Sequence, residues 1–569
     1  MEDDEQTLLR EDNTDTTLSK LSKFRRYQAL LRKDVQVEDK NIKQEPMDLC
    51  WEHIQATATI EEREGQFWCL HKKEVTKEIL NDVSGMAKAE SFLAILGPSG
   101  SGKTTLLNCL TKRNLGLLKV KGRILVNGKH TGEDICDISS YVQQDDLFIG
   151  LLTVREHLWF NAILRLDRDL QDYEIIQRVS DVIKEMGLRK CENTTIGEPG
   201  LAKSLSGGER KRLAFATELL VKPTIMLCDE PTSGLDSFMA RSVVGALKDM
   251  ANKGHTIVAT IHQPSSDVFD MFNDILIMKE GRTVFLGPKQ DAMKFFSELS
   301  YECPRHYNPA DYFMDVLHDT PGQEICDSFD ESKYSNEIKY GVDAQEDVLD
   351  NKSIGEMKGL DKRTKRKEKA GWWLQMKMCF WRSQIEFMRN THLFLGRILA
   401  ILALCLPVAG IYWRQPYTTT GADNINGALF MMLLSVSYSV AVPSIVGTSV
   451  GFPLFLKECH DGQYSTSAYY FGGLCAELPF VAFAVLLGTS CSYWMIDCEY
   501  YDDDKDTDRN STNLEDESPF CYRNGLDVIA YFGFSTDRVG FGFGVIVAIL
   551  ITLELLGSLA FHLNIKRAK

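Results

Sequence analysis

The pattern of hydrophobic and polar positions divides the 569-residue chain into stretches of different character. Residues 1–50 are polar and charged with few aromatic residues, which is typical of a disordered cytosolic tail. Residues 51–316 alternate short apolar runs with turns and amphipathic segments, a pattern that predicts an α/β domain. Residues 317–370 are charged and irregular and are predicted to form a linker, whereas residues 371–569 are far more apolar.

Four segments of the apolar part are long enough to cross a bilayer, which takes about 20 mostly apolar residues. They comprise about 393–413, 427–452, 469–496 and 539–563. Ahead of them, residues 371–390 place tryptophans among basic residues in a helix-like pattern. This favours a connecting helix that lies in the membrane interface, with a plain surface helix as the alternative. We therefore expect an integral, multi-pass membrane protein.

Basic residues set the predicted orientation of these spans. A cluster at 362–367 and the basic C-terminal end flank the apolar part, and such flanks are typical of the cytosolic side. Four spans leave both flanks in the cytosol and place the loop 497–538 outside it. This loop contains a glycosylation acceptor at Asn510. Cys498 and Cys521 would lie in an oxidising compartment and could form a disulfide, within or between chains.

Three charged residues interrupt the predicted spans. Arg397 lies near the inner end of the first span, and we expect its guanidinium to extend toward the interface. Glu477 is expected near the cytosolic end of the third span, and Glu554 is expected to pair within the helix bundle. Because charged groups inside a membrane are rare, either glutamate is a candidate functional residue.

Composition narrows the classes of function. The net charge of −16 argues against nucleic acid as a main partner. The first 30 residues contain no apolar signal region, so the N-terminal part is expected in the cytosol. The 15 cysteines are scattered without C-x-x-C pairs, so we do not expect a zinc site.

The most specific motif is GPSGSGKTT at 97–105, which fits the phosphate-binding pattern G-x-x-x-x-G-K-[ST]. A strand-like run precedes it and a helix-like run follows it, as the motif requires. Glycines let backbone N–H groups approach phosphate oxygens, and the helix N-terminus adds partial positive charge. Lys103 is predicted to reach the β- and γ-phosphates and Thr104 to bind Mg²⁺. The expected nucleotide-binding residues are Gly97, Pro98, Ser99, Gly100, Ser101, Gly102, Lys103, Thr104 and Thr105.

Polar side chains also follow three later apolar runs. One run ends in Asp229, predicted to hold Mg²⁺ through water, and Glu230, predicted to polarise the hydrolytic water. Gln144 could supply a side-chain oxygen to Mg²⁺ or to that water, with a merely solvated glutamine as the alternative. His262 follows the run 256–261, and we favour a contact with the γ-phosphate over a structural role.

A second anion-binding arrangement lies at 205–209, where LSGGE opens a helix-like run. It has no lysine of the P-loop type, so it could cradle a γ-phosphate only if another P-loop completed the site. A tight loop follows at 233–236. The predicted signature residues are Leu205, Ser206, Gly207, Gly208 and Glu209.

These motifs, in this order, resemble the ATP-binding cassette (ABC) ATPases over about 51–316. The segments HQPSS at 262–266 and NPADY at 308–312 further resemble subfamily G, the White-type half-transporters. This resemblance implies an α/β P-loop ABC ATPase domain followed by an all-α transmembrane domain, with ATP and Mg²⁺ as cofactors. It also implies ATP-driven export of a lipid, sterol, pigment precursor or other amphipathic small molecule across the plasma membrane or an internal organelle membrane.

The resemblance also implies a partner chain. The sequence contains one P-loop and one signature. In the ABC fold that it resembles, these two motifs lie on opposite sides of the domain. ATP is then sandwiched between the P-loop of one chain and Ser206–Gly208 of another. A second half-transporter chain, identical or different, is therefore the expected partner.

The membrane part departs from the pattern of the family, whose members have six spans. Residues 493–496 lead directly into Asp497 and Cys498, so that the fourth and fifth family spans are expected to be missing. Two hypotheses stay open: a dimeric exporter, or a shortened, non-transporting chain that binds ATP and regulates full-length partners. A soluble ABC ATPase of translation or repair is a third, against which the apolar spans argue.

Overall fold

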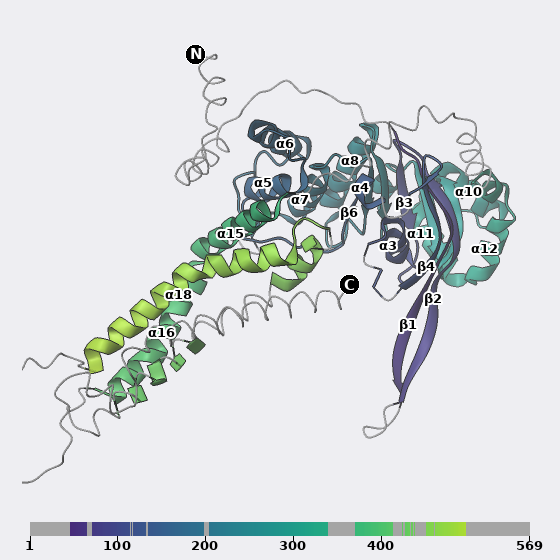
Figure 1. Ribbon diagram of the computed structural model, residues 1–569. Helices are drawn as coiled ribbons and strands as arrows, with labels where there is room; N and C mark the ends of the chain where they lie inside the picture. Colours follow the sequence, from purple (N-terminus) through teal and green to yellow (C-terminus); the bar gives the residue numbers. More distant parts are fainter. Residues whose placement is uncertain are drawn as a thin grey trace, which may run out of the picture. The chain divides into compact units, whose positions relative to one another are not determined.

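The computed structural model describes most of the chain from residue 46 to residue 496 and forms two compact units, Met1–Lys369 and Ala370–Lys569 (Figure 1). The described residues are 46–64, 71–113, 115–116, 118–131, 135–197, 204–338, 370–413, 451–459 and 461–496, with stretches of one to three residues between 424 and 438.

A six-stranded sheet of order β10-β9-β3-β8-β7-β6 forms the centre of the first unit. Neighbouring strands are parallel from β9 to β6, and β10 is antiparallel to β9. Strands buried on both faces are typically continuous apolar runs, as predicted for 92–96. The strands are β3 (Phe92–Leu96), β6 (Ser139–Val142), β7 (Ile225–Cys228), β8 (Thr256–Thr260), β9 (Asp274–Lys279) and β10 (Arg282–Pro288).

Polar side chains set the starts of the helices that surround this sheet. Thr153, Ser206, Asp236 and Asn308 each accept a hydrogen bond from a backbone N–H in the first turn of the helix that follows. Such caps satisfy groups that the helix leaves unpaired. The helices are α3 (Lys103–Thr111), α4 (Ile135–Ile138), α5 (Val154–Arg165), α6 (Asp172–Glu185), α7 (Gly207–Leu219), α8 (Ser237–Asn252), α9 (Ser266–Phe269), α10 (Lys289–Glu298), α11 (Pro309–Asp319) and α12 (Gly322–Asp330).

A second, antiparallel sheet has the order β2-β1-β4-β5. Its long hairpin of β1 and β2 is prominent in Figure 1. Trp51 is fully buried, and a Cβ atom on Gly85 would lie 2.6 Å from its ring, so only glycine fits there. The strands are β1 (Leu49–Glu64), β2 (His71–Ala87), β4 (Leu118–Val126) and β5 (Lys129–His130).

The expected linker start at residue 317 is wrong. Helix α11 continues to Asp319, and α12 follows it. Phe329 of α12 packs edge-on against Phe285 and Phe295, with ring centroids 6.0 and 5.9 Å apart. Charged positions of this stretch lie outside while spaced apolar positions are buried, so a high charge content did not indicate an irregular segment.

The second unit is helical. Its long helices are α15 (Trp372–Arg389), α16 (Thr391–Ile411) and α18 (Thr466–Ile496). Among the described residues, Phe394–Ile411 and Thr466–Gly488 are long and apolar enough to cross a membrane, judged by length and composition. The predicted span 539–563 and the loop 497–538, with Asn510, Cys498 and Cys521, lie outside the described residues, as does most of 427–452.

Two ion pairs join helices of this unit. The buried Arg382 donates to Glu458 at 2.7 Å, and the Tyr464 hydroxyl donates to the same carboxylate oxygen at 2.6 Å. Arg397 was expected to extend toward the interface, but its side chain is buried and lies 3.4 Å from Glu477. The pairing is possible because α16 and α18 pack side by side and bring the two charges together.

Breaking the first pair tests this packing. Arg382→Met leaves the Glu458 carboxylate buried without its cation, which typically costs about 3–5 kcal/mol. We expect a clear fall in melting temperature of the detergent-solubilised protein, with partial recovery in the double variant Arg382→Met/Glu458→Gln. The exposed Lys377 of the same helix provides the control, because Lys377→Met is expected to change stability by less than about 0.5 kcal/mol. Equal melting temperatures for Arg382→Met and Lys377→Met would contradict the assignment.

Candidate nucleotide-binding site

Four loops meet at one edge of the parallel sheet. The P-loop follows β3, Gln144 follows β6, Asp229 and Glu230 follow β7, and His262 follows β8. Because these strands are parallel and adjacent in the order β3-β8-β7-β6, their carboxyl ends lie at the same edge. This is the edge at which α/β sheets bind ligands.

The glycines of the P-loop are required by its backbone. Gly97 has φ 152°, and a Cβ atom there would lie 2.3 Å from the carbonyl oxygen of Met278. Gly102, directly before α3, has φ 94°, and a Cβ atom there would meet the side chain of Leu80 at 2.7 Å. Residues with side chains rarely adopt such conformations. The close approach of the loop to β9 and β2 therefore depends on glycine at these two positions.

Lys103 lies over the loop that precedes it. Its ammonium donates hydrogen bonds to the carbonyl oxygens of Gly97 at 2.8 Å and Pro98 at 2.9 Å. Burial lowers the pKa of the Lys103 ammonium, against the opposing effect of the carboxylates of Glu230 and Asp229. The buried hydroxyl of Ser101 makes no hydrogen bond within the described residues. An unpaired buried donor in a glycine-lined cradle fits the oxygen atoms of a phosphate.

Asp229 is the most highly connected carboxylate of the site. It accepts hydrogen bonds from the hydroxyls of Thr260 at 2.7 Å, Thr104 at 3.1 Å and Tyr141 at 3.5 Å. Burial and the nearby Asp229 charge raise the pKa of Tyr141, so that its hydroxyl stays a donor. A carboxylate beside a threonine hydroxyl is the oxygen-rich set that Mg²⁺ prefers, so Asp229 and Thr104 fit this ion.

Glu230 is held from two sides. Its backbone has φ 42°, an uncommon conformation for a residue other than glycine. Its N–H donates to the Thr260 hydroxyl at 2.8 Å, and its carboxylate accepts a bond from the Gln144 side-chain amide at 2.8 Å. The bond leaves the Gln144 amide oxygen as an acceptor. The structure therefore brings together Glu230, Gln144, Asp229 and Thr104.

Thr260 and Tyr141 are the site residues that sequence reasoning missed. Thr260 joins the two acidic residues, because it donates to Asp229 and accepts from the Glu230 N–H. Both missed residues carry hydroxyl groups near the carboxyl ends of strands, β8 and β6. That signal was present in the sequence, but no motif includes it.

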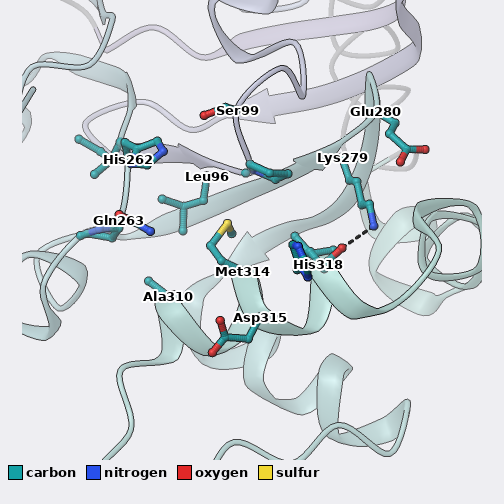
Figure 2. Close-up of a pocket in the computed structure, with 15 residues that line it drawn as sticks. Leu96, Ser99, His262, Gln263, Lys279, Glu280, Ala310, Met314, Asp315 and His318 are labelled. Carbon is teal, nitrogen blue, oxygen red and sulfur yellow. Dashed lines mark hydrogen bonds between the residues drawn. The ribbon is translucent and has the colours of Figure 1, made fainter.

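His262 lies beside the P-loop. It is exposed and lines a hollow of about 540 Å³ together with Gly97, Pro98 and Ser99 (Figure 2). The strand β8 delivers it to this position, since the backbone N–H of Ile261 still bonds to the carbonyl of Ile95 on β3 at 3.0 Å.

The signature residues lie at a different hollow, which has a volume of about 640 Å³. It is lined by the Gln144 loop, by most of residues 204–211 and by Ser233–Leu235. None of the P-loop residues is among its described lining residues. Ser206 and Glu209 form a reciprocal cap at the start of α7, with bonds of 2.9 and 3.3 Å. Burial raises the pKa of Glu209, but the hydrogen bonds from Ser206 outweigh it and lower this pKa. The signature and the P-loop therefore do not share one hollow.

The helix that follows the signature is bound to the Gln144 loop. The buried Lys211 of α7 donates to the carbonyl oxygen of Gln144 at 2.5 Å and pairs with Asp146 at 3.1 Å. Arg210 donates to the carbonyl oxygen of Asp146 at 3.2 Å. A continuous set of bonds thus joins the signature helix, Gln144 and Glu230.

Comparison with protein families matches both units. The ABC transporter family matches residues 80–233, and the ABC-2 type transporter family matches residues 374–501. A further ABC-2 type transporter model matches residues 262–333, which fold within the first unit. The predicted architecture, a P-loop ABC ATPase domain followed by a helical membrane domain, is confirmed by these matches.

Relatives align along most of the chain. Protein white of Drosophila melanogaster is 40% identical over 437 residues, which cover 74% of this chain and 62% of that protein. The ABC transporter ATP-binding protein/permease wht-3 of Caenorhabditis elegans is 34% identical over 79% of this chain and 71% of that protein. The broad substrate specificity ATP-binding cassette transporter ABCG2 of Mus musculus is 33% identical over 75% of this chain and 68% of that protein. The chain thus spans less than two thirds of the length of Protein white.

Removing the Thr260 hydroxyl tests the geometry around the acidic pair. Thr260→Val keeps the shape of the side chain but removes a bond to the Asp229 carboxylate, and bonds to charged groups contribute about 1.5–3 kcal/mol. We expect the Mg²⁺ concentration that half-saturates nucleotide binding to rise at least about tenfold. A fluorescent ATP analogue titrated with Mg²⁺ measures it.

The matched control is Thr283→Val in β10. The Thr283 hydroxyl is buried and makes no hydrogen bond to the part of the chain that the structure describes. Its loss is therefore expected to leave the Mg²⁺ dependence unchanged. Equal Mg²⁺ dependence in the two variants would contradict the role of Thr260.

Proposed function

Because the chain belongs to the White-type ABC transporters of subfamily G, we propose that it is an ATP-hydrolysing half-transporter that acts as a dimer and exports an amphipathic small molecule. The observation that supports this most directly is the convergence of Lys103, the Asp229–Thr104 pair and the Gln144–Glu230 pair at one edge of the sheet. These groups match the needs of phosphoryl transfer to water, namely charge neutralisation and an oriented nucleophile.

Glu230 is the proposed catalytic base. The Gln144 amide holds its carboxylate, and the Thr260 hydroxyl holds its backbone, so the carboxylate can polarise a water molecule in line with the γ-phosphate. Thr104, Asp229 and the Gln144 oxygen would hold Mg²⁺. The bound ion would neutralise charge on the transferred phosphoryl group. Lys103 and the backbone of the P-loop bind the phosphates. His262 contacts the γ-phosphate from β8.

A second chain completes each site in this proposal. The P-loop and the signature line separate hollows, so one chain alone does not enclose a nucleotide between them. Ser206 and Gly208 lie at the N-terminal end of α7, where backbone N–H groups and the helix dipole favour an anion. We propose that they contact the γ-phosphate held by the partner's P-loop. Two such sites form between two chains.

The second unit is the proposed translocation domain. It matches an ABC-2 type transporter model and contains two described helices that are long and apolar enough for a bilayer. The proposed substrate is a lipid, sterol, pigment precursor or similar amphipathic molecule, and the membrane is the plasma membrane or that of an organelle. The glycan at Asn510 and the Cys498–Cys521 disulfide remain part of this proposal.

Hydrolysis by the purified chain in lipid nanodiscs tests the proposal. Glu230→Gln removes the base but keeps the size of the side chain, so we expect ATP turnover to fall at least about 100-fold while ATP binding persists. Glu298→Gln, at an exposed glutamate on α10, is the control and should hydrolyse like the unaltered protein. Turnover in Glu230→Gln equal to the control would contradict the assignment. ATP binding without hydrolysis in the unaltered chain, alone and with partner half-transporters, would favour the regulatory alternative.

A further inference from the structure

Phe238 is the most exposed large apolar side chain in the described part of the first unit, with 82% of its surface accessible. It lies in the first turn of α8. Asp236 caps this helix by accepting a bond from the Met239 N–H at 2.9 Å, which fixes the turn. A phenyl ring held out on a rigid helix start loses little conformational freedom on docking, which suits it to a contact with another chain.

The helix turn that carries this ring packs against the signature. A Cβ atom on Gly208 would lie 3.5 Å from the side chain of Met239, the residue after Phe238. A Cβ atom on Gly207 would lie 2.9 Å from Leu235, in the loop before α8. The first turn of α8 and the signature glycines are therefore packed together. Phe238 belongs to this same turn of α8.

A cavity of suitable size lies beside the P-loop of the same chain. The hollow of about 540 Å³ that His262 lines is bounded by the end of β3, the loop after β8 and helix α11 (Figure 2). A cavity of about 150 Å³ can hold a benzene molecule, so a phenyl ring fits with room to spare. Its lining is mixed: Leu96, Pro98, Ile261, Pro264, Ala310 and Met314 are apolar, whereas His262, Lys279, Glu280, Asp315 and His318 are polar or charged. The Met314 thioether adds a favourable sulfur–aromatic contact.

Asn308 stabilises one wall of this cavity. Its side-chain amide donates to the carbonyl oxygen of Pro264 at 2.8 Å and to Asp311 at 2.9 Å, so it ties α11 to the loop after His262. Gln263 in that loop has φ 45°. The cavity is thus formed before any partner binds, which lowers the cost of filling it.

We propose that Phe238 of one chain inserts into this cavity of a second copy of the same chain, and that the second copy reciprocates. The inference rests on the proposed sandwich, which brings the signature of one chain onto the P-loop of the other. Phe238 accompanies the signature and the cavity accompanies the P-loop, so the same closure aligns them. Ring and cavity occur on one chain, which makes the contact self-complementary about a two-fold axis. Insertion also fixes the loop of His262, and so links dimer closure to the catalytic site.

Measuring ATP turnover in Phe238 variants distinguishes a loss of this contact from a general loss of folding. Phe238→Asp removes the apolar ring and brings a carboxylate to a cavity that already contains Glu280 and Asp315, and we expect ATP turnover to fall at least about tenfold while ATP affinity of the chain stays unchanged. Phe238→Leu keeps an apolar side chain and is expected to retain most of the turnover. Tyr173→Asp, at an exposed aromatic residue of α6, is the matched control and should leave turnover unchanged.

Cross-linking tests whether a second copy of the chain supplies the ring that occupies the cavity. The double variant Phe238→Cys/Met314→Cys, in the Glu230→Gln background, is treated with a short bifunctional thiol reagent. We expect a covalent dimer of the purified chain that requires ATP and is absent from either single cysteine variant, which controls for the native cysteines.

Three results would overturn the inference. The first is that the double cysteine variant forms no more cross-linked dimer than the single cysteine variants. The second is that Phe238→Asp and Tyr173→Asp have the same ATP turnover. The third is that the cross-link forms only to a different co-expressed half-transporter. If the unaltered chain hydrolyses ATP and Glu230→Gln does not, such results refute the contact alone. If the unaltered chain does not hydrolyse ATP, the proposed function fails and this inference with it.

Discussion

The buried carboxylate of Asp229 is the constraint on which the site depends. It joins the end of β7 to the Thr104 hydroxyl at the start of α3 and to the Thr260 hydroxyl at the end of β8. A buried charge is stable only where hydrogen bonds or ions compensate for it, so these three elements must keep one arrangement. The same Thr260 hydroxyl fixes the backbone of Glu230, and Glu230 in turn holds Gln144.

The second constraint is that, in the proposed dimer, this arrangement is half of a site. The P-loop and the signature open onto different hollows of one unit, although Lys211 links the signature helix to Gln144 within the chain. An event at the signature can therefore reach the Gln144–Glu230 pair of the same chain through α7. In a dimer, that pair serves the other nucleotide. This connection gives a physical route by which the two nucleotides of a dimer sense each other.

Much of the fold and of the nucleotide-binding site could be predicted from sequence, because the motif residues are required by local backbone conformation and local hydrophobic pattern. The glycines of the P-loop follow from backbone conformation at Gly97 and Gly102, and the buried strands from apolar runs. Contacts between distant segments could not be predicted. Thr260 belongs to no motif, Arg397 pairs with Glu477 across 80 residues, and the charged stretch after residue 317 folds through apolar positions spaced within it. The exposure of Phe238 depends on how α8 packs, which no local pattern reveals.

Complementation between two inactive chains tests the shared site most directly. Lys103→Met removes the P-loop cation, and Ser206→Arg blocks the signature. Each variant alone should be inactive, whereas co-expressed chains should recover about a quarter of the unaltered turnover, because about half of the dimers are mixed and each contains one intact site. A chain with both substitutions, co-expressed with the unaltered chain, should form no active mixed dimer. If the mixed single variants stay inactive although they assemble, the P-loop and signature do not act in trans, and the account is wrong.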